Sequence, residues 1–207
     1  YTLYKKKLSE MGSIPYADHH GAMVCNNTSH CKAYIDVEKD KQELWGDNAD
    51  KWLTVIKNAV DSTDGEILEY QDEPIAAVFH SVSAEKTESA KDVWRGETPY
   101  LVSVDSPGSE AASNYIGSVT YTDEEFKKIF SSVYKNADFS SGIKGYFRDS
   151  HRSEAGGIID VEVCKVRLSG NRIRSLFGLN STNFTITTDD NSITFHTKGC
   201  GHGVGMS

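Results

Sequence analysis

The clearest periodic pattern of hydrophobic and polar positions begins at residue 47. Its apolar residues fall at i, i+3, i+4, i+7 and i+8, and they are Trp52, Val55, Ile56, Ala59 and Val60. This spacing places them on one side of an α-helix. Asp47, Asn48 or Asp50 can cap its first turn. We therefore expect an amphipathic helix here.

A capping box predicts a second helix. Thr122 is followed three residues later by Glu125, so each side chain can bond the backbone N–H of the other residue. Apolar residues then continue at helical spacing, at Phe126, Ile129, Phe130 and Val133. Weaker patterns indicate the last turns of a helix at residues 1–8 and a short helix at 173–177.

Alternating and β-branched runs predict the strands. One hairpin is expected from residues 67–70 and 74–80, a second from 184–188 and 193–197, and further strands at 101–104, 115–121 and 158–168. Residues 16–34 are rich in His, Cys, Asn and Gly and predict a long loop. Hairpins and helices follow one another without a βαβ rhythm, so the expected fold class is α+β.

The chain of 207 residues suits one large domain or two small ones. Small residues gather at 105–114, so we expect a first subdomain over residues 1–106 and a second over 107–207, flanking a substrate groove. No start signal precedes the helical pattern at residue 1, and the sequence stops inside a Gly-rich motif at residue 207. We therefore expect both ends to be truncated.

Charge excludes one class of partner. Lys and Arg number 22 against 30 Asp and Glu, a formal charge of −8. Binding to nucleic acid depends on neutralising phosphates with clustered cations, so we expect no nucleic-acid partner. No stretch approaches the roughly 20 consecutive apolar residues of a membrane-spanning helix.

A cluster in the long loop has the chemistry of a metal site. His19, Cys25 and Cys31 are spaced H-x5-C-x5-C. Thiolate and imidazole ligands suit tetrahedral zinc, and the fourth position would fall to His30, His20 or a water. A disulfide between Cys25 and Cys31, or an incidental grouping of loop residues, are the alternatives.

Two segments together resemble one protein family. The first comprises His80–Ser83, Thr87–Ser89, Asp92–Trp94 and Pro99–Leu101, and it resembles the H-S-x-S-G-G-x-T-E, D-V-W and P-Y-L motifs of the stage II sporulation protein D family. The second, Gly201–Ser207, resembles the start of that family's G-H-G-V-G-M-S-Q-Y-G-A signature. With Ser169–Phe184 and the His/Cys loop, the resemblance extends over nearly the whole chain.

The resemblance implies a lytic transglycosylase of peptidoglycan. Such an enzyme cuts denuded glycan strands between N-acetylmuramic acid and N-acetylglucosamine and leaves 1,6-anhydro ends. The implied partner is a cell-wall amidase that first removes the stem peptides. The implied location is outside the cytoplasm, on an N-terminal membrane anchor, during engulfment in sporulation.

The resemblance also assigns roles to residues. The family's candidate acid/base glutamate lies on a helix upstream of the position matching Tyr1, so no residue of this chain is assigned a catalytic role. Eight residues are expected to bind substrate: Tyr1, His80, Ser81, Ser83, Thr87, Glu88, Tyr100 and His202. Ala84 and Glu85 replace two glycines of the family motif, and Val102 stands where a basic or polar residue is common.

Two other functions compete with this interpretation. One is a non-catalytic glycan-binding module that enhances a cell-wall amidase. The other is a zinc-dependent hydrolase built on His19, Cys25 and Cys31, which chelation should inactivate.

Overall fold

The computed structural model describes residues 19–22, 24–27, 31 and 34–207. The chain forms two compact units, residues 1–76 and 77–207. This division falls before the one expected at 106/107, because residues 77–106 pair with the C-terminal segment. Phe79, for example, forms a β-bridge with Met206.

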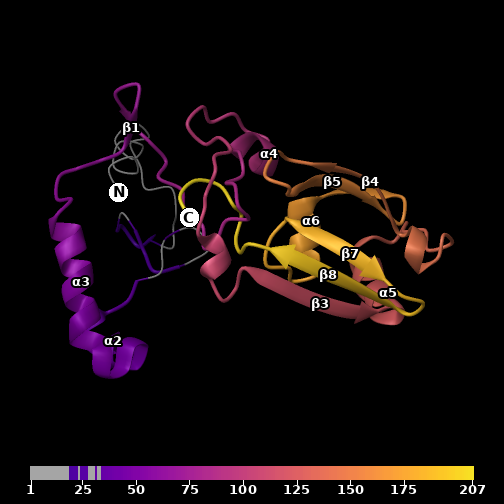
Figure 1. Cartoon of the computed structure of the whole chain (residues 1–207), viewed down its shortest axis with the longest axis horizontal. Helices are drawn as coiled ribbons and strands as arrows, with labels where there is room; N and C mark the ends of the chain where they lie inside the picture. The colour runs from indigo at the N-terminus through magenta and orange to yellow at the C-terminus, as the bar shows by residue number, and fades with distance from the viewer. Residues whose placement is uncertain (1–18, 23, 28–30, 32–33) are drawn as a thin grey trace. The chain divides into compact units, whose positions relative to one another are not determined.

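The described residues of the first unit form two consecutive α-helices joined by a short 3₁₀ helix, and a small hairpin (Figure 1). Its elements are α2 (Val37–Trp45), η2 (Gly46–Asn48), α3 (Ala49–Asp61), β1 (Glu69–Tyr70) and β2 (Glu73–Pro74). The amphipathic helix predicted from residue 47 is confirmed as α3. The predicted hairpin is confirmed but much shorter than expected, since its strands have two residues each. Gln71 and Asp72 form its turn with φ of 53° and 62°.

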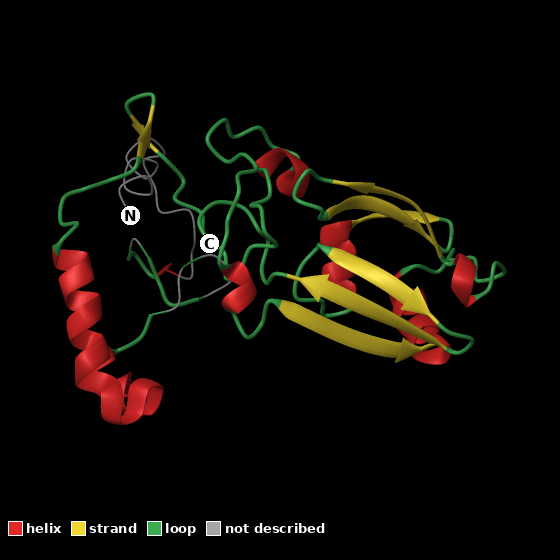
Figure 2. Ribbon diagram, viewed as in Figure 1, coloured by secondary structure: helices red, strands yellow, loops and turns green. Residues whose placement is uncertain are grey.

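The second unit is built on two antiparallel sheets of three strands (Figures 1 and 2). The first has the order β3-β8-β7 and comprises β3 (Ile116–Thr122), β7 (Phe184–Thr188) and β8 (Ser192–Lys198). The second has the order β4-β5-β6 and comprises β4 (Phe147–Arg152), β5 (Ile158–Val163) and β6 (Val166–Ser169). The predicted hairpin of residues 184–197 and the strand at 115–121 are thus confirmed.

The expectation of one continuous strand at 158–168 was wrong. Residues Cys164 and Lys165 adopt φ of 48° and 63° and turn the chain between β5 and β6. Residues 101–104, also predicted as a strand, form no named strand. Isolated backbone hydrogen bonds hold this segment instead. For example, Leu101 O accepts from Ala90 N at 2.9 Å.

The helices of the second unit are α4 (Ala90–Trp94), η3 (Ser109–Ala111), α5 (Asp123–Val133), η4 (Ile143–Gly145) and α6 (Gly170–Leu176). A serine or threonine side chain caps the start of α4, α5 and α6. The capping box at the start of α5 is confirmed, with Thr122 and Glu125 making both reciprocal bonds. Ser169 caps α6, whose Arg172 N donates to the Ser169 hydroxyl at 3.2 Å.

Aromatic side chains fill the main core of the second unit. Phe126 stacks on Phe177 with ring centroids 4.9 Å apart, and Phe177 stacks on Phe195 at 5.2 Å. These rings come from α5, from the residue that follows α6 and from β8, so the core joins the helices to the sheet and confirms the α+β class.

Among the helices of the described residues, none combines the length and the apolar character that crossing a bilayer requires.

Candidate functional site

The structure brings the two motif segments into one site. Residues 79–88 and 200–206 run beside each other, with β-bridges Phe79–Met206, Val82–Cys200 and Glu88–Val204. Backbone bonds join them as well, since His80 N donates to Met206 O at 2.9 Å and Glu88 N donates to Gly203 O at 2.7 Å. Motifs more than a hundred residues apart in the sequence therefore form a single paired structure.

His80 lies at the centre of this structure and is buried. Its Nδ1 lies 3.1 Å from the Val204 carbonyl oxygen, and its Nε2 lies 2.8 Å from the Ser83 hydroxyl. A carbonyl oxygen only accepts, so Nδ1 carries the proton and Nε2 accepts from Ser83. Burial lowers the pKa of His80. The imidazole is therefore held neutral and in one tautomer.

Ser83 and Thr87, both expected to bind substrate, have protein partners instead. Ser83 is 1% exposed and its hydroxyl is bonded to His80. The Thr87 hydroxyl donates to Val102 O at 3.1 Å and accepts from Val104 N at 3.0 Å. The Ser83 hydroxyl therefore orients His80 within the motif segment, and the Thr87 hydroxyl holds that segment to residues 102–104.

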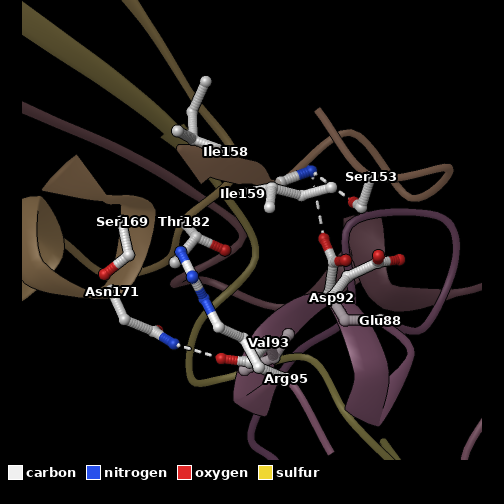
Figure 3. Close-up of a pocket in the computed structure, with 11 residues that line it drawn as sticks. Glu88, Asp92, Val93, Arg95, Ser153, Ile158, Ile159, Ser169, Asn171 and Thr182 are labelled. Carbon is white, nitrogen blue, oxygen red and sulfur yellow. Dashed lines mark hydrogen bonds between the residues drawn. The ribbon is translucent and has the colours of Figure 1, made fainter. Parts of the chain in front are cut away.

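Glu88 is a buried carboxylic acid that contacts both the C-terminal motif segment and the loop at Gly157. One carboxyl oxygen accepts from Gly157 N at 3.0 Å (Figure 3). A Cβ at Gly157 would lie 2.3 Å from that oxygen, so a larger residue there would displace the Glu88 carboxyl group. Burial raises the pKa of Glu88, while hydrogen bonds from Ser153 and Gly157 act in the opposite direction.

A pocket with both polar and apolar lining residues adjoins Glu88. Its lining also includes Asp92, Arg95, Ser153, Asn171 and Thr182 (Figure 3). Asn171 Nδ2 closes one wall by donating to Val93 O at 3.0 Å. Asn171 and Thr182 belong to the segment Ser169–Phe184 that the family resemblance includes, whereas no sequence pattern marked Ser153. Folding brings all three to Glu88.

Ser81, Tyr100 and His202 are the more accessible residues of the predicted set. Ser81 is exposed, and Asn114 Nδ2 donates to its hydroxyl at 3.4 Å. Tyr100 is half-buried against the small apolar cluster around Leu101. His202 is also half-buried, and its Nδ1 accepts from Val204 N at 3.1 Å.

Trp94, from the segment that resembles the D-V-W motif, joins this accessible group. It ends α4, and its ring lies 5.1 Å from that of His202, which lies 5.9 Å from that of His80. Trp94 is 47% exposed, so part of its face is open to a ligand. The predicted Tyr1 lies outside the described residues.

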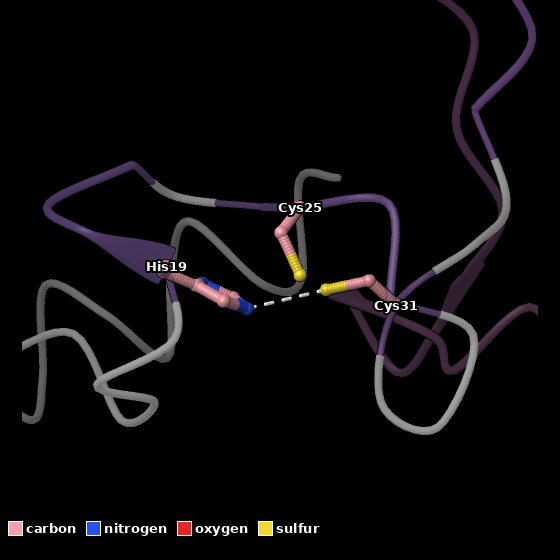
Figure 4. Close-up of side chains that lie close together, drawn as sticks. All are labelled: His19, Cys25 and Cys31. Carbon is pink, nitrogen blue, oxygen red and sulfur yellow. Dashed lines mark hydrogen bonds between the residues drawn. The ribbon is translucent and has the colours of Figure 1, made fainter.

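The first unit gathers the predicted metal ligands. The ligand atoms of His19, Cys25 and Cys31 all lie within 4.8 Å of one another (Figure 4). His19 is 3% exposed, and its Nε2 lies 3.4 Å from the Cys31 sulfur. Two sulfurs and one imidazole nitrogen at this spacing fit three ligands of a tetrahedral zinc ion. His30, predicted as a further ligand, lies outside the described residues.

Comparison with known proteins finds relatives over most of the chain. No family model matches it. Stage II sporulation protein D of Bacillus subtilis (strain 168) is 36% identical over 176 residues, covering 84% of this chain and 50% of the relative. The protein of the same name from Bacillus amyloliquefaciens is 36% identical over 84% of this chain and 49% of its own length.

A more distant relative is an amidase enhancer of Bacillus subtilis (strain 168). It is 23% identical over 75% of this chain and 29% of its own length. This chain spans about half the length of the two sporulation relatives.

Proposed function

Since the chain belongs to the stage II sporulation protein D family, we propose that it acts on the bacterial cell wall in sporulation, as a lytic transglycosylase of peptidoglycan. Its substrate would be glycan strands from which an amidase has removed the stem peptides. Its place would be outside the cytoplasm, on a membrane anchor in the whole protein.

The observation that carries this proposal is the pairing of the two motif segments. The family resemblance rests on residues 80–101 and 201–207, and the structure joins these two segments through Phe79–Met206, Val82–Cys200 and Glu88–Val204. A shared site explains why both motifs occur in one chain. Its accessible side chains are aromatic or hydroxyl-bearing, as suits a sugar ligand.

The chemistry requires one carboxylic acid. The acid donates its proton to the glycosidic oxygen as the bond from that oxygen to C1 breaks. The C6 hydroxyl oxygen of the same muramyl residue then bonds to C1 and returns its proton to the carboxylate. The product is a 1,6-anhydro ring, and no water is consumed. The resemblance expects this acid upstream of Tyr1.

We assign two groups of residues to this reaction. Ser81, Tyr100 and His202 would contact the sugar, with Trp94 offering an aromatic face. His80 and Ser83 would hold the loop that carries His202, since His80 bonds the Val204 carbonyl. Glu88 would act in the same way through Gly203 and Gly157.

Zinc would serve the first unit as a structural ion. His19, Cys25 and Cys31 supply three ligands. The fourth would be His30, His20 or a water. A bound ion would link His19, Cys25 and Cys31 and so stabilise the folded first unit.

A second candidate function is favoured by the more distant relative, which is named an amidase enhancer. In that role the chain would bind glycan and raise the activity of a cell-wall amidase without cutting the strand.

Product analysis with denuded glycan strands tests the proposal. We expect the full-length protein to release anhydro-muramyl ends, and Ser81→Ala and Tyr100→Phe each to slow this release by about tenfold or more. Ser150→Ala and Tyr134→Phe remove matched hydroxyls elsewhere in the second unit and should leave it unchanged. Glycan binding without anhydro products would favour the enhancer instead. Unchanged rates in the Ser81 and Tyr100 variants would refute the assignment of the sugar-contacting residues.

A further inference from the structure

A pocket of about 250 Å³ lies between the two sheets of the second unit. It is lined by residues of β4 and β5 from one sheet and of β7 from the other, and β7 is the strand of its sheet that faces β4 and β5 (Figure 1). These residues lie outside the motif segments 80–101 and 201–207, so the motifs do not account for this pocket. Its apolar lining residues and one arginine are Phe147, Ile158, Val161, Phe184, Ile186 and Arg152.

Strand β7 is the edge of its sheet, and its free side lies along this pocket. The order β3-β8-β7 leaves one side of β7 without a neighbouring strand. On its other side, toward β8, Lys198 N donates to Asn183 O at 2.9 Å. Bonded pairs alternate along an antiparallel ladder, so the backbone groups of Ile186 and Thr188 point away from β8. Among the hydrogen bonds of the described residues, none outside the strand ladders involves either amide.

The other edge beside the pocket, β4, is less suited to pairing with a further strand. Its register with β5 shifts after Arg148, and Asp149 adopts a φ of 47°. Such a bulge bends a strand and interrupts regular pairing, which protects the edge. Strand β7 keeps one register with β8 over all five of its residues. An incoming strand would therefore pair with β7.

Arg152 supplies a positive charge where β7 begins. Its Nη1 donates to Gly156 O at 2.7 Å and its Nη2 donates to Phe184 O at 2.8 Å, and both acceptors are neutral carbonyls. Burial lowers the pKa of Arg152, because the charged guanidinium loses solvent. Among the described residues no carboxylate forms an ion pair with it, and Asp149 pairs with Arg167 instead. The guanidinium N–H groups that these bonds leave over are available to an anionic ligand.

These features together favour a peptide over other ligands. Small-molecule sites usually enclose roughly 300–1,000 Å³, so a pocket of about 250 Å³ suits one side chain of a longer ligand. An extended peptide repeats its N–H and C=O groups every second residue, as the free edge of β7 does at Ile186 and Thr188. A glycan or a lipid lacks this repeat, and a glycan would also bury hydroxyl groups against apolar walls. The charge of Arg152 favours a carboxylate on the peptide.

We propose that the free edge of β7 and the adjoining pocket bind an extended segment of a partner protein, one that carries a large apolar residue and an acidic residue. The segment adds a strand to β7 at Ile186 and Thr188. Its apolar side chain enters the pocket between the sheets, and its carboxylate contacts Arg152. This inference goes beyond the proposed function, because it assigns a protein-binding surface whether or not the chain cuts glycan.

Hydrogen exchange of the full-length protein without a partner is the first test. The amides of Ile186 and Thr188 should exchange quickly, while those of Thr185 and Thr187, which face β8, should exchange slowly. Residue-resolved NMR measures both pairs in one experiment. Slow exchange at Ile186 and Thr188 in the free protein would overturn the proposal, because another part of the full chain would then cover this edge.

Peptide binding is the second test. The probes are fluorescent peptides of about eight residues that alternate Val and Thr around one Leu, with a single Asp moved from position to position. A matched set carries Lys in place of Asp. We expect at least one Asp peptide to bind and to slow exchange at Ile186 and Thr188, and its Lys counterpart to bind at least about tenfold more weakly. Equal binding of the two sets, no binding by any peptide, or displacement of the peptide by denuded glycan strands would overturn the proposal.

Two proline variants separate the β7 edge from general surface effects. Thr188→Pro removes an N–H that the ladder with β8 does not use, and proline is tolerated at such edge positions. Ser118→Pro is the matched control on β3, the opposite edge, because Gly199 N bonds Tyr115 O and alternation turns the Ser118 N–H away from β8. We expect Thr188→Pro to bind the Asp peptide at least about fivefold more weakly and Ser118→Pro to bind it as the wild type does.

Arg152→Gln tests the charge. Glutamine keeps an amide donor for Phe184 O but removes the positive charge, so the preference for Asp over Lys peptides should disappear. Circular dichroism checks the fold of every variant, and the comparison of Asp and Lys peptides on the wild type decides the matter if a variant is unfolded. Equal affinity of the wild type, Thr188→Pro and Arg152→Gln for the Asp peptide would overturn the proposal.

Discussion

Ser81 and Ser83 are two residues apart in the same motif, yet their surroundings differ completely. Ser81 is exposed, while Ser83 is 1% exposed and bonded to His80 Nε2 at 2.8 Å. The motif therefore contains one serine available to a ligand and one that orients a buried imidazole. A spacing of two suggests a shared strand face, but residues 80–83 are held by single β-bridges and do not form a regular strand.

Ser83→Ala is expected to destabilise the second unit. It leaves His80 Nε2 buried without its donor, which costs about 1–3 kcal/mol of unfolding free energy. Urea unfolding followed by tryptophan fluorescence measures this. Ser81→Ala is the matched control and should change stability by less than about 0.5 kcal/mol. Equal effects of the two substitutions would contradict the His80–Ser83 bond.

Glu88 is expected to make stability depend on pH. Its pKa is raised in the folded protein above the ordinary 4.5, so the folded state binds its proton more tightly than the unfolded state. Its contribution is therefore most favourable below 4.5 and is lost as the pH rises through the raised pKa. Glu88→Gln keeps an acceptor for Gly157 N and removes this titration.

The measurement compares the unfolding free energy of wild type and Glu88→Gln across this pH range. The wild type should lose stability relative to the variant as the pH rises above 4.5. A constant difference between the two proteins would show that Glu88 does not titrate with a raised pKa.

Helix α5 shows how far local signals reach at the scale of one element. Its capping box and apolar spacing were both visible in the sequence, and the structure has both. The capping bonds join residues only three positions apart, so they do not depend on contacts with the rest of the chain. The apolar side of α5 then supplies Phe126 and Phe130 to the core.

Thr122→Ala is expected to lower the unfolding free energy by about 1 kcal/mol. It removes the hydroxyl that accepts from Glu125 N at 3.2 Å, and alanine cannot cap a helix. Thermal or urea unfolding measures the loss. Thr122→Ser keeps the cap and should recover most of the stability, and a Thr122→Ser variant as unstable as Thr122→Ala would argue against a capping role.

Elements without a local signal were missed or misjudged. Strand β4 is mostly exposed and polar, so it shows neither alternation nor an apolar run. Helix α2 has a polar sequence and likewise offers no apolar stripe. Between β5 and β6 the turn residues are Cys164 and Lys165, which lack the usual Gly or Asn. The hairpin is imposed there by pairing with the rest of the sheet.

At the scale of the whole molecule, the first unit is expected to depend on zinc. His19, Cys25 and Cys31 present three ligand atoms within 4.8 Å of one another. We expect one zinc per chain by metal analysis of untagged protein. Chelation should lower the thermal transition of the unit of residues 1–76 and leave that of residues 77–207 unchanged, as calorimetry can resolve.

Cysteine variants provide the control for the zinc prediction. Cys25→Ser should lose the ion, while Cys200→Ser, a cysteine of the second unit, should retain it. Protein without stoichiometric zinc, in which Cys25 and Cys31 resist thiol reagents, would indicate a disulfide instead.

The sequence alone was enough to predict those features that arise from interactions between nearby residues or from a contiguous motif. Periodicity and capping identified α3, α5 and the β7–β8 hairpin, composition indicated the acidic balance, and two short motifs indicated the family. These features depend on residues within one or two helical turns of each other, or on their identity alone.

Folding alone established which motif residues a ligand can reach. Burial of His80, Ser83 and Glu88 results from pairing with residues more than a hundred positions away. The rows of side chains across β3, β8 and β7 likewise require the register of three strands, which long-range pairing sets. Such contacts depend on how the whole chain packs, and no local pattern of hydrophobic and polar positions specifies them.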